Sequence, residues 1–302
     1  MKTTITQAMS ERILLLDGAM GSLLQSRLPH YRGLADALVI DRPEEIAQIH
    51  RAYRAAGADC ITTCTFSSHG NRQTNLQAAR LARKIADQYT ATTGQQRFVL
   101  GDIGPTDYML SLSPDLNRPE YRACTFDTLR EAYRIQIEAL VEGGVDALLI
   151  ETATDTLNVK AALWAAQQVA EQTGKTCPII ISMTVVDKSG RMLSGQTIEA
   201  FVETVIHAHP LAIGLNCGFG AEAMLPWLRQ MHRAVAGRCL VTCHPNAGLP
   251  NALGEYDLTP EEMAMSIRSM MEEDLVNMVG GCCGTTPDFI RVFRQVIDKN
   301  AR

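Results

Sequence analysis

The chain has 302 residues, of which 46% are hydrophobic and 20% charged, so it carries enough apolar side chains for a full core and is neither fibrous nor disordered. Its 28 Lys and Arg and 33 Asp and Glu residues give a formal charge of −5 with both signs interleaved, which argues against a nucleic-acid or anionic-membrane binder. No apolar run approaches the roughly 18 residues of a membrane span, and the polar stretch 1–11 lacks a signal-peptide core, so we expect a cytoplasmic protein.

Short apolar runs rich in Val, Ile and Leu alternate with longer stretches of helical period, which is the pattern of parallel βα units. In chain order the predicted strands are 13–16, 60–63, 98–100, 147–150, 179–184, 212–215, 239–243 and 276–279. The absence of a linker between these units, and of Gly-x-Gly-x-x-Gly after the first of them, disfavours two Rossmann-like halves. We therefore predict an α/β fold, a single (β/α)₈ TIM barrel over residues 1–302 with a short polar extension at 1–11.

Helix start and stop signals lie between the predicted strands. The segment 259–262 (Thr-Pro-Glu-Glu) predicts a capping box with Pro at the first helical position; 41–44 (Asp-Arg-Pro-Glu) has the same acid spacing, and 286–287 repeats the hydroxyl-Pro pair. Gly57-Ala58-Asp59 and Gly144-Val145-Asp146 predict glycine helix ends before the second and fourth strands. Their offset of 87 residues equals two βα units, a weak internal repeat consistent with a barrel.

In a barrel, chemistry lies at the carboxyl ends of the strands, and three cysteines are predicted there. Adjacent strand side chains point to opposite faces, so Cys282 and Cys283 can reach one point only if the backbone turns sharply, which their flanking glycines allow. Cys217 follows the sixth strand on the same rim. Three thiolates suit tetrahedral Zn²⁺ and leave a fourth position open, which is typical of a catalytic site, although buried cysteines are also common core residues.

The remaining cysteines are expected to have structural positions. Cys60 and Cys239 are predicted to pack in the barrel, Cys64 and Cys243 lie nearer the rim and stay ambiguous, and Cys124 and Cys177 are incidental. His244, directly after the seventh strand, is expected to support a loop more often than to ligate a metal.

Two carboxylates, Asp17 and Glu151, also follow predicted strands. Aimed into a rim pocket they would hold a substrate ammonium, while the N–H groups of the turn Gly18-Ala19 would take a carboxylate. Together they predict a clamp for an α-amino acid; the alternative is that each acid caps the following helix.

These residues resemble the homocysteine S-methyltransferase family. The resemblance is carried by Asp-Gly-Ala-Met-Gly at 17–21, Gly-Leu-Asn-Cys at 214–217 and Gly-Gly-Cys-Cys-Gly-Thr at 280–285. Ser-Gly-Gln-Thr at 194–197, His-Pro-Asn-Ala-Gly-Leu-Pro-Asn at 244–251 and Gly-Glu-Tyr-Asp at 254–257 are similar to the homocysteine-binding module of cobalamin-dependent methionine synthases. The match runs from Asp17 to the last helix.

The resemblance implies that Cys217, Cys282 and Cys283 bind Zn²⁺ and that Asp17 and Glu151 hold the amino end of homocysteine. In related modules a side-chain oxygen fills the vacant zinc position before substrate binds, and Asn246 is the candidate here. One departure is Thr-Cys-Thr-Phe at 63–66, where the family usually has Thr-Asn-Thr-Phe. A thiol in that substrate-lining loop puts the substrate preference in question and brings Cys64 into consideration near the metal.

The expected reaction moves a methyl group to the homocysteine thiol, with Zn²⁺ supplying the thiolate and no side-chain nucleophile or general base. One barrel leaves no room for folate and corrinoid modules, and no His has an Asp two residues before it as in the corrinoid signature. We therefore favour methylcobalamin on a separate corrinoid protein as the donor. S-methylmethionine or another small donor is the alternative enzyme hypothesis, and a zinc-stabilised binding subunit that is inactive without its partner is the alternative of another class.

Overall fold

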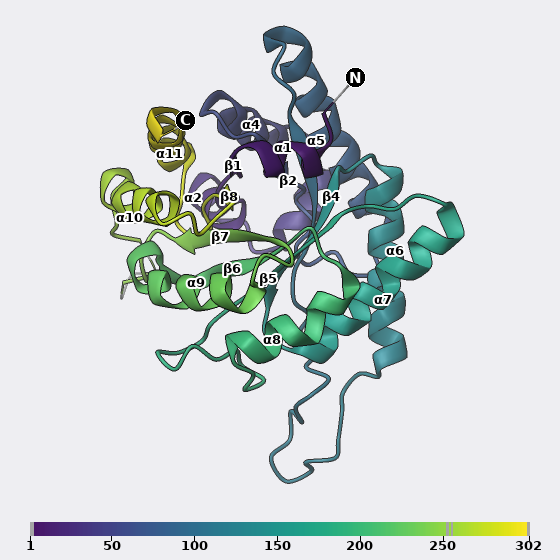
Figure 1. Cartoon of the computed structure of the whole chain (residues 1–302). Coiled ribbons are helices and arrows are strands. Elements are labelled where there is room, and N and C mark those ends of the chain that lie inside the picture. Colours follow the sequence, from purple (N-terminus) through teal and green to yellow (C-terminus); the bar gives the residue numbers. More distant parts are fainter. Residues whose placement is uncertain (1–2, 252–253, 255, 301–302) are drawn as a thin grey trace.

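The computed structural model describes residues 3–251, 254 and 256–300, and its strands form one parallel sheet that curves into a barrel (Figure 1). The eight strands follow the order β1-β8-β7-β6-β5-β4-β3-β2. They are β1 (Leu14–Leu15), β2 (Cys60–Thr62), β3 (Phe98–Ile103), β4 (Ala147–Ala153), β5 (Ile179–Met183), β6 (Ala212–Gly220), β7 (Leu240–Asn246) and β8 (Met278–Val279). The predicted (β/α)₈ barrel is confirmed, and each predicted strand overlaps an observed one.

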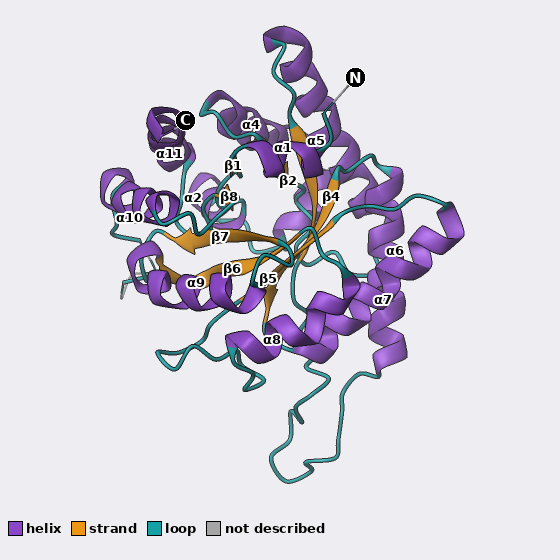
Figure 2. Cartoon of the chain, in the orientation of Figure 1, coloured by secondary structure: helices purple, strands orange, loops and turns teal. Residues whose placement is uncertain are grey.

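Helices surround the strands on the outside of the barrel (Figure 2). They are α1 (Ile5–Glu11), α2 (Gly21–Arg27), α3 (Leu38–Asp41), α4 (Pro43–Ala55), α5 (Arg72–Thr93), α6 (Phe126–Glu142), α7 (Thr156–Thr173), α8 (Ile198–Val205), α9 (Ala221–Val235), α10 (Pro260–Glu272) and α11 (Pro287–Asn300), with 3₁₀ turns at Ala35–Ala37 and Ile206–Ala208. None of the helices in the described part of the chain has the length and apolar character needed to cross a bilayer.

Alternating strand residues divide the core into two clusters, as the period of two in a strand requires. Inward-facing residues such as Cys60, Phe98 and Leu149 fill the barrel, and outward-facing residues pack against the helices. The inner cluster also contains the apolar face of α1, formed by Ile5, Ala8 and Met9. We expected residues 1–11 to be a polar extension only. Their described part, 3–11, includes a helix that packs onto the barrel interior; residues 1–2 lie outside the described chain.

Most of the helix signals act as predicted. Thr259 and Glu262 form a capping box at the start of α10, and the Thr286 hydroxyl accepts the Asp288 amide at 3.3 Å at the start of α11. The acid spacing at 41–44 is the exception. Asp41 is the last residue of α3, and the N-cap of α4 is Arg42, which makes no side-chain capping bond, because the chain passes from one helix to the next within a residue.

The two predicted glycine helix ends have a second function in joining strands. Asp59, two residues after Gly57, accepts the Leu15 amide at 3.0 Å and donates its own amide to the Leu15 carbonyl at 2.7 Å. Asp146 makes the same pair of contacts with Val99 on β3, at 2.7 and 2.8 Å. The weak repeat thus corresponds to the same aspartate–backbone contact, made before β2 and again before β4. Each contact fixes the register of two neighbouring strands at their amino ends.

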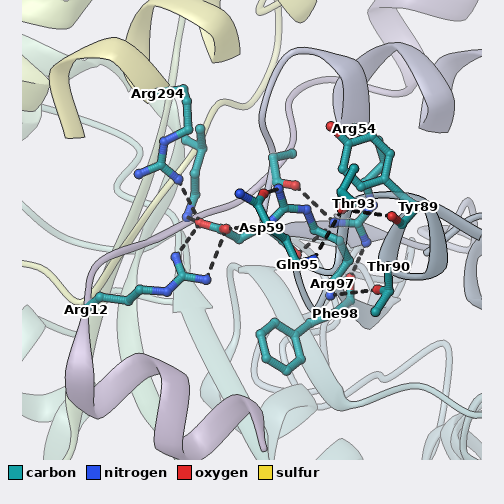
Figure 3. A network of polar contacts seen from close by, with 12 residues as sticks. Arg12, Arg54, Asp59, Tyr89, Thr90, Thr93, Gln95, Arg97, Phe98 and Arg294 are labelled. Atoms are coloured by element: carbon teal, nitrogen blue, oxygen red, sulfur yellow. Dashed lines mark hydrogen bonds and ion pairs between the residues drawn. The ribbon is translucent and has the colours of Figure 1, made fainter. Parts of the chain in front are cut away.

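Asp59 is also the centre of a charge cluster (Figure 3). Its carboxylate, 2% exposed, accepts bonds from Arg12 at 2.9 Å, Arg97 at 2.9 Å and Arg294 at 3.0 Å. Burial alone would raise the pKa of Asp59, but the hydrogen bond and charge of Arg12, with Arg294, hold that pKa below its ordinary value. One carboxylate therefore ties the start of β1, the start of β3 and α11 to the start of β2.

We expect Asp59→Asn to lower the free energy of unfolding by about 3 kcal/mol, because it leaves three guanidinium groups without their shared anion. Since the folded pKa of Asp59 is depressed, this contribution is present above the unfolded value near 4 and is lost as pH falls through the folded pKa. Urea unfolding of both proteins at neutral and acidic pH measures it. A loss below about 1 kcal/mol at neutral pH would show that the cluster is not a stabilising element.

Candidate metal centre and substrate pocket

The structure brings together three cysteine sulfurs from two distant segments at the carboxyl ends of the strands. The Sγ atoms of Cys217, Cys282 and Cys283 all lie within 4.8 Å of one another, and those of Cys217 and Cys283 are 3.9 Å apart. Tetrahedral Zn–S bonds of about 2.3 Å place two sulfurs roughly 3.8 Å apart. All nine cysteines are free thiols, and these three form the only group of potential metal ligands among the His, Cys, Asp and Glu residues in the described ranges.

Unusual backbone conformations place these sulfurs. Cys217 has a φ of 58°, in the left-handed region, and the pairing of β6 with β7 shifts register between Asn216 and Gly220. In the other segment, a Cβ on Gly281 would lie 2.2 Å from the Thr285 hydroxyl oxygen, so only glycine allows the turn that aims both Cys282 and Cys283 at Cys217.

Asn216, fully buried, fixes the irregular end of β6. Its side-chain oxygen accepts the Thr152 amide at 2.9 Å and the Ser182 hydroxyl at 2.7 Å, and its Nδ2 donates to the Thr152 hydroxyl at 2.8 Å. Thr152 itself has a φ of 57° and follows Glu151 in a second register shift, between β4 and β5. One amide therefore cross-links the strand ends that carry Glu151 and Cys217, a role that no sequence signal had suggested.

Asn246 lies next to the cysteines at the end of β7. Its Oδ1 accepts the Cys283 amide at 3.1 Å, and its side chain also hydrogen bonds to the Cys217 sulfur. The Cys282 amide is bound by the Pro245 carbonyl at 2.8 Å, so β7 holds both cysteines of the loop in place. Asn246 thus orients the cysteine loop, and its oxygen already has one hydrogen-bond donor.

The three thiols share charge. Hydrogen bonds from Cys282 and Cys283 lower the pKa of Cys217, while the same contacts raise the pKa of Cys282 well above its ordinary value. The cluster therefore favours one thiolate stabilised by two S–H donors, and a bound cation would favour ionisation of the others. Soft, closely spaced thiolates are the donor set that Zn²⁺ prefers, so these residues fit the expected metal.

A cavity of about 240 Å³ opens beside the sulfurs and contains both predicted carboxylates, Asp17 and Glu151. Burial raises the pKa of each to about 7, although the Thr62 amide, 2.9 Å from Asp17 Oδ2, opposes this for Asp17. No Lys, Arg or His is found among the cavity-lining residues of the described chain. The charge of Arg54, outside this lining, lowers the pKa of Asp17 only in part. Buried acids with no basic group in the cavity wall indicate a pocket that binds a cation.

The turn Gly18-Ala19 also lines this cavity. The Ala19 amide donates to the Thr285 hydroxyl at 3.2 Å, and the Ala19 carbonyl accepts the Tyr53 hydroxyl at 2.7 Å. Since the Tyr53 hydroxyl also donates to the Thr285 carbonyl at 3.1 Å, the turn and the cysteine loop are held as one unit. In this conformation the Ala19 amide can bind a substrate carboxylate only if the Thr285 hydroxyl yields or shares it.

The structure separates the other candidate residues from the metal cluster. Cys60 is in the barrel interior as predicted, whereas Cys64 lies beyond the end of β2 and its thiol contacts Asp36 at 3.9 Å, on the cavity wall but outside the metal group. Cys243 packs in the outer core cluster. His244 is buried, and burial lowers its pKa to about 4; neither ring nitrogen has a partner in the described chain, so the predicted loop-supporting bond is not made.

Two further acids in the cavity wall were missed. Asp36 accepts the Ser67 amide at 2.7 Å and the Ser68 hydroxyl at 2.8 Å, and so shapes the loop after β2. Asp102, at the end of β3, hydrogen bonds to Glu151. Burial and the charge of Glu151 raise the pKa of Asp102 well above its ordinary value. The sequence signal for Asp102 was available, since it is a single acid at the end of an apolar strand.

Comparisons with known proteins agree with this geometry. The family model described as homocysteine S-methyltransferase matches residues 14–297. Among solved structures, the metallated form of the homocysteine methyltransferase MmuM from Escherichia coli is similar with a TM-score of 0.71 and 24% identity, covering 94% of this chain and 96% of that one. Its oxidized form has a TM-score of 0.76 and 22% identity, covering 94% and 95%. At these identities the structural likeness establishes the fold.

Proposed function

The chain belongs to the homocysteine S-methyltransferase family, and on that premise we propose that it transfers a methyl group to the thiol of homocysteine, forming methionine, with Zn²⁺ at Cys217, Cys282 and Cys283. The observation that carries the proposal is the convergence of three thiols at the edge of a cavity with buried acids. Zn²⁺, when bound by these thiolates, would keep the substrate sulfur as a thiolate at neutral pH and leave it electron-rich.

The residues of the chain hold and orient the substrate. Asp17 and Glu151 accept the ammonium group, and the Gly18-Ala19 turn binds the carboxylate, which shares the Ala19 amide with the Thr285 hydroxyl. This leaves the side chain of homocysteine directed toward the cysteines. Asn246 would occupy the fourth ligand position before substrate binds; to do so it would present Oδ1 to the metal while still accepting the Cys283 amide. With both ends of the amino acid fixed, the sulfur attacks the methyl carbon in line, so that the S–C bond forms while the bond from the donor to that carbon breaks and its electron pair stays on the donor; no protein nucleophile is needed.

We favour methylcobalamin on a separate corrinoid protein as the donor. Most exposed large apolar side chains in the described chain lie on loops that follow strand ends, among them Tyr108, Leu112 and Leu116 on the loop 104–125, which extends away from the barrel (Figure 2), and Val186, Leu193 and Leu249. Exposed apolar side chains on these loops are suited to contact a docked protein or a bulky donor. The same apolar surface also supports the alternative of a subunit that binds homocysteine but transfers the methyl group only when its partner is docked. We propose a cytoplasmic location.

The test is methionine formation by the purified, zinc-loaded chain with homocysteine and, separately, methylcobalamin or S-methylmethionine. We expect methionine with methylcobalamin, because the exposed apolar side chains on the loops after the strands offer a surface for a large donor. Methionine only with S-methylmethionine would identify the small-donor enzyme. Homocysteine binding without methionine from either donor would favour the partner-dependent subunit, and no binding of homocysteine would contradict all three.

A further inference from the structure

Asp102 is a buried acid with no assigned function in the proposed reaction. It is 6% exposed and lines the cavity beside Glu151, and no N–H or hydroxyl group of the described chain donates to its Oδ1. A buried polar atom without a partner is costly, so a carboxyl group in a cavity wall with such an atom indicates a missing hydrogen-bond donor.

The position of Asp102 follows from the strand. Along β3, Phe98 and Leu100 point into the barrel, and Asp102 continues this alternation at the carboxyl end, where the barrel interior becomes the cavity floor. The backbone of Asp102 is fixed on both sides: its amide donates to the Thr63 hydroxyl at 2.9 Å, and its carbonyl accepts the Thr65 hydroxyl at 2.6 Å. The backbone from which the carboxyl group extends is therefore held in place before any ligand arrives.

The neighbours of Asp102 are acids. Its carboxyl group hydrogen bonds to Glu151, and the charges of Asp36 and Asp17 also act on it. Two carboxyl groups in a hydrogen bond share one proton, so the pair carries one negative charge and retains free acceptor positions. Asp36 differs, because its Oδ2 already accepts the Ser67 amide and the Ser68 hydroxyl and its Oδ1 contacts the Cys64 thiol.

We propose that Asp102 is a substrate-binding residue that accepts the third N–H of the substrate ammonium, alongside Asp17 and Glu151. An ammonium group has three donors and no acceptor, and Asp17 already accepts the Thr62 amide and hydroxyl, so a third acid supplies an acceptor for the third N–H. With Asp102 as the third acceptor, the pocket selects a primary ammonium and disfavours thiols that lack one. The proposal rests on homocysteine being the substrate.

The experiment compares two thiols that differ only in the amino group, L-homocysteine and 4-sulfanylbutanoate, by calorimetric binding to the zinc-loaded protein. We expect Asp102→Asn to weaken homocysteine binding about tenfold or more, because a charge-assisted hydrogen bond is lost, and to change binding of the analogue less than about twofold. Asp36→Asn is the matched control: it removes a buried acid of the same cavity and should affect both thiols equally. Asp102→Ser, checked by its thermal midpoint, gives a second reading if the amide variant folds poorly.

Equal losses for both thiols in the Asp102 variants would overturn the proposal, because a structural role does not distinguish the ligands. Unchanged binding of homocysteine would overturn it as well. A wild-type protein that binds no homocysteine contradicts the proposed function together with this inference. A wild-type protein that prefers homocysteine, with no change in that preference in the variants, contradicts only the role of Asp102.

Discussion

Replacing Cys282 by Ala is expected to remove zinc from the purified protein and to lower methyl transfer to homocysteine by about a thousandfold. Thiolate–zinc bonds account for a binding free energy on the order of 10 kcal/mol or more in four-ligand sites, so the loss of one ligand costs several kcal/mol. Cys282 lies within 4.8 Å of both other sulfurs and its thiol donates to Cys217. Its removal therefore also takes away a contact that stabilises the Cys217 thiolate. Zinc content by mass spectrometry and kcat/KM for homocysteine measure the two effects.

Cys124→Ala is the matched control. This cysteine lies in the loop before α6, half-buried and outside the metal group, so its removal should leave both zinc content and activity unchanged. Full methyl transfer by zinc-free Cys282→Ala protein would refute the proposed role of the metal.

Replacing Asp17 by Asn is expected to lower kcat/KM for homocysteine about a hundredfold with zinc content unchanged. Truncating one partner of a buried, hydrogen-bonded charge pair costs roughly 2 to 5 kcal/mol. The amide oxygen of Asn can still accept the Thr62 amide that Asp17 binds at 2.9 Å, so the turn should keep its shape. Asp87→Asn, which changes an exposed acid on α5, is the control and should have no effect. A less than threefold loss in Asp17→Asn would remove Asp17 from the clamp.

The same substitution should change how stability depends on pH in the metal-free protein without substrate. Burial raises the folded pKa of Asp17 to about 7, above its unfolded value, so the folded state binds this proton more tightly. Stability of the wild type therefore falls as pH rises from about 4 through 7, and the variant lacks this contribution. The unfolding free energy of Asp17→Asn relative to wild type should therefore be about 2.5 kcal/mol higher at pH 8 than at pH 5. A pH-independent difference in unfolding free energy would show that Asp17 is ionised in the folded state throughout this range.

The sequence predicted the elements whose signals are local. Apolar runs gave all eight strands because parallel strands in a barrel are buried on both faces, and Gly-x-Asp before β2 and β4 marked a real repeat. The cysteine triad could also be predicted from the sequence, since adjacent cysteines between glycines have few purely structural explanations. The predicted ends of the strands were less accurate. The observed β4 and β6 extend through Glu151 and Cys217, because the register shifts there let functional segments keep pairing with their neighbours.

Contacts between distant segments could not be read from the chain. Asn216 precedes Cys217 in the recognised motif, but its bonds to Thr152 and Ser182 depend on β4, β5 and β6 being adjacent. The Asp102–Glu151 pair likewise exists only because β3 and β4 are neighbours in the sheet. Cys64 shows the converse: its position in a substrate loop suggested the metal, whereas the fold directs its thiol to Asp36.

X-ray absorption at the zinc edge of the zinc-loaded protein, before and after saturation with L-homocysteine, tests the central claim most directly. The account predicts three sulfur neighbours at about 2.3 Å from one zinc ion, with a lighter atom as the fourth, and four sulfur neighbours once homocysteine is bound. Fewer than three sulfur neighbours in the first spectrum, or an unchanged sulfur count after homocysteine is added, would contradict it.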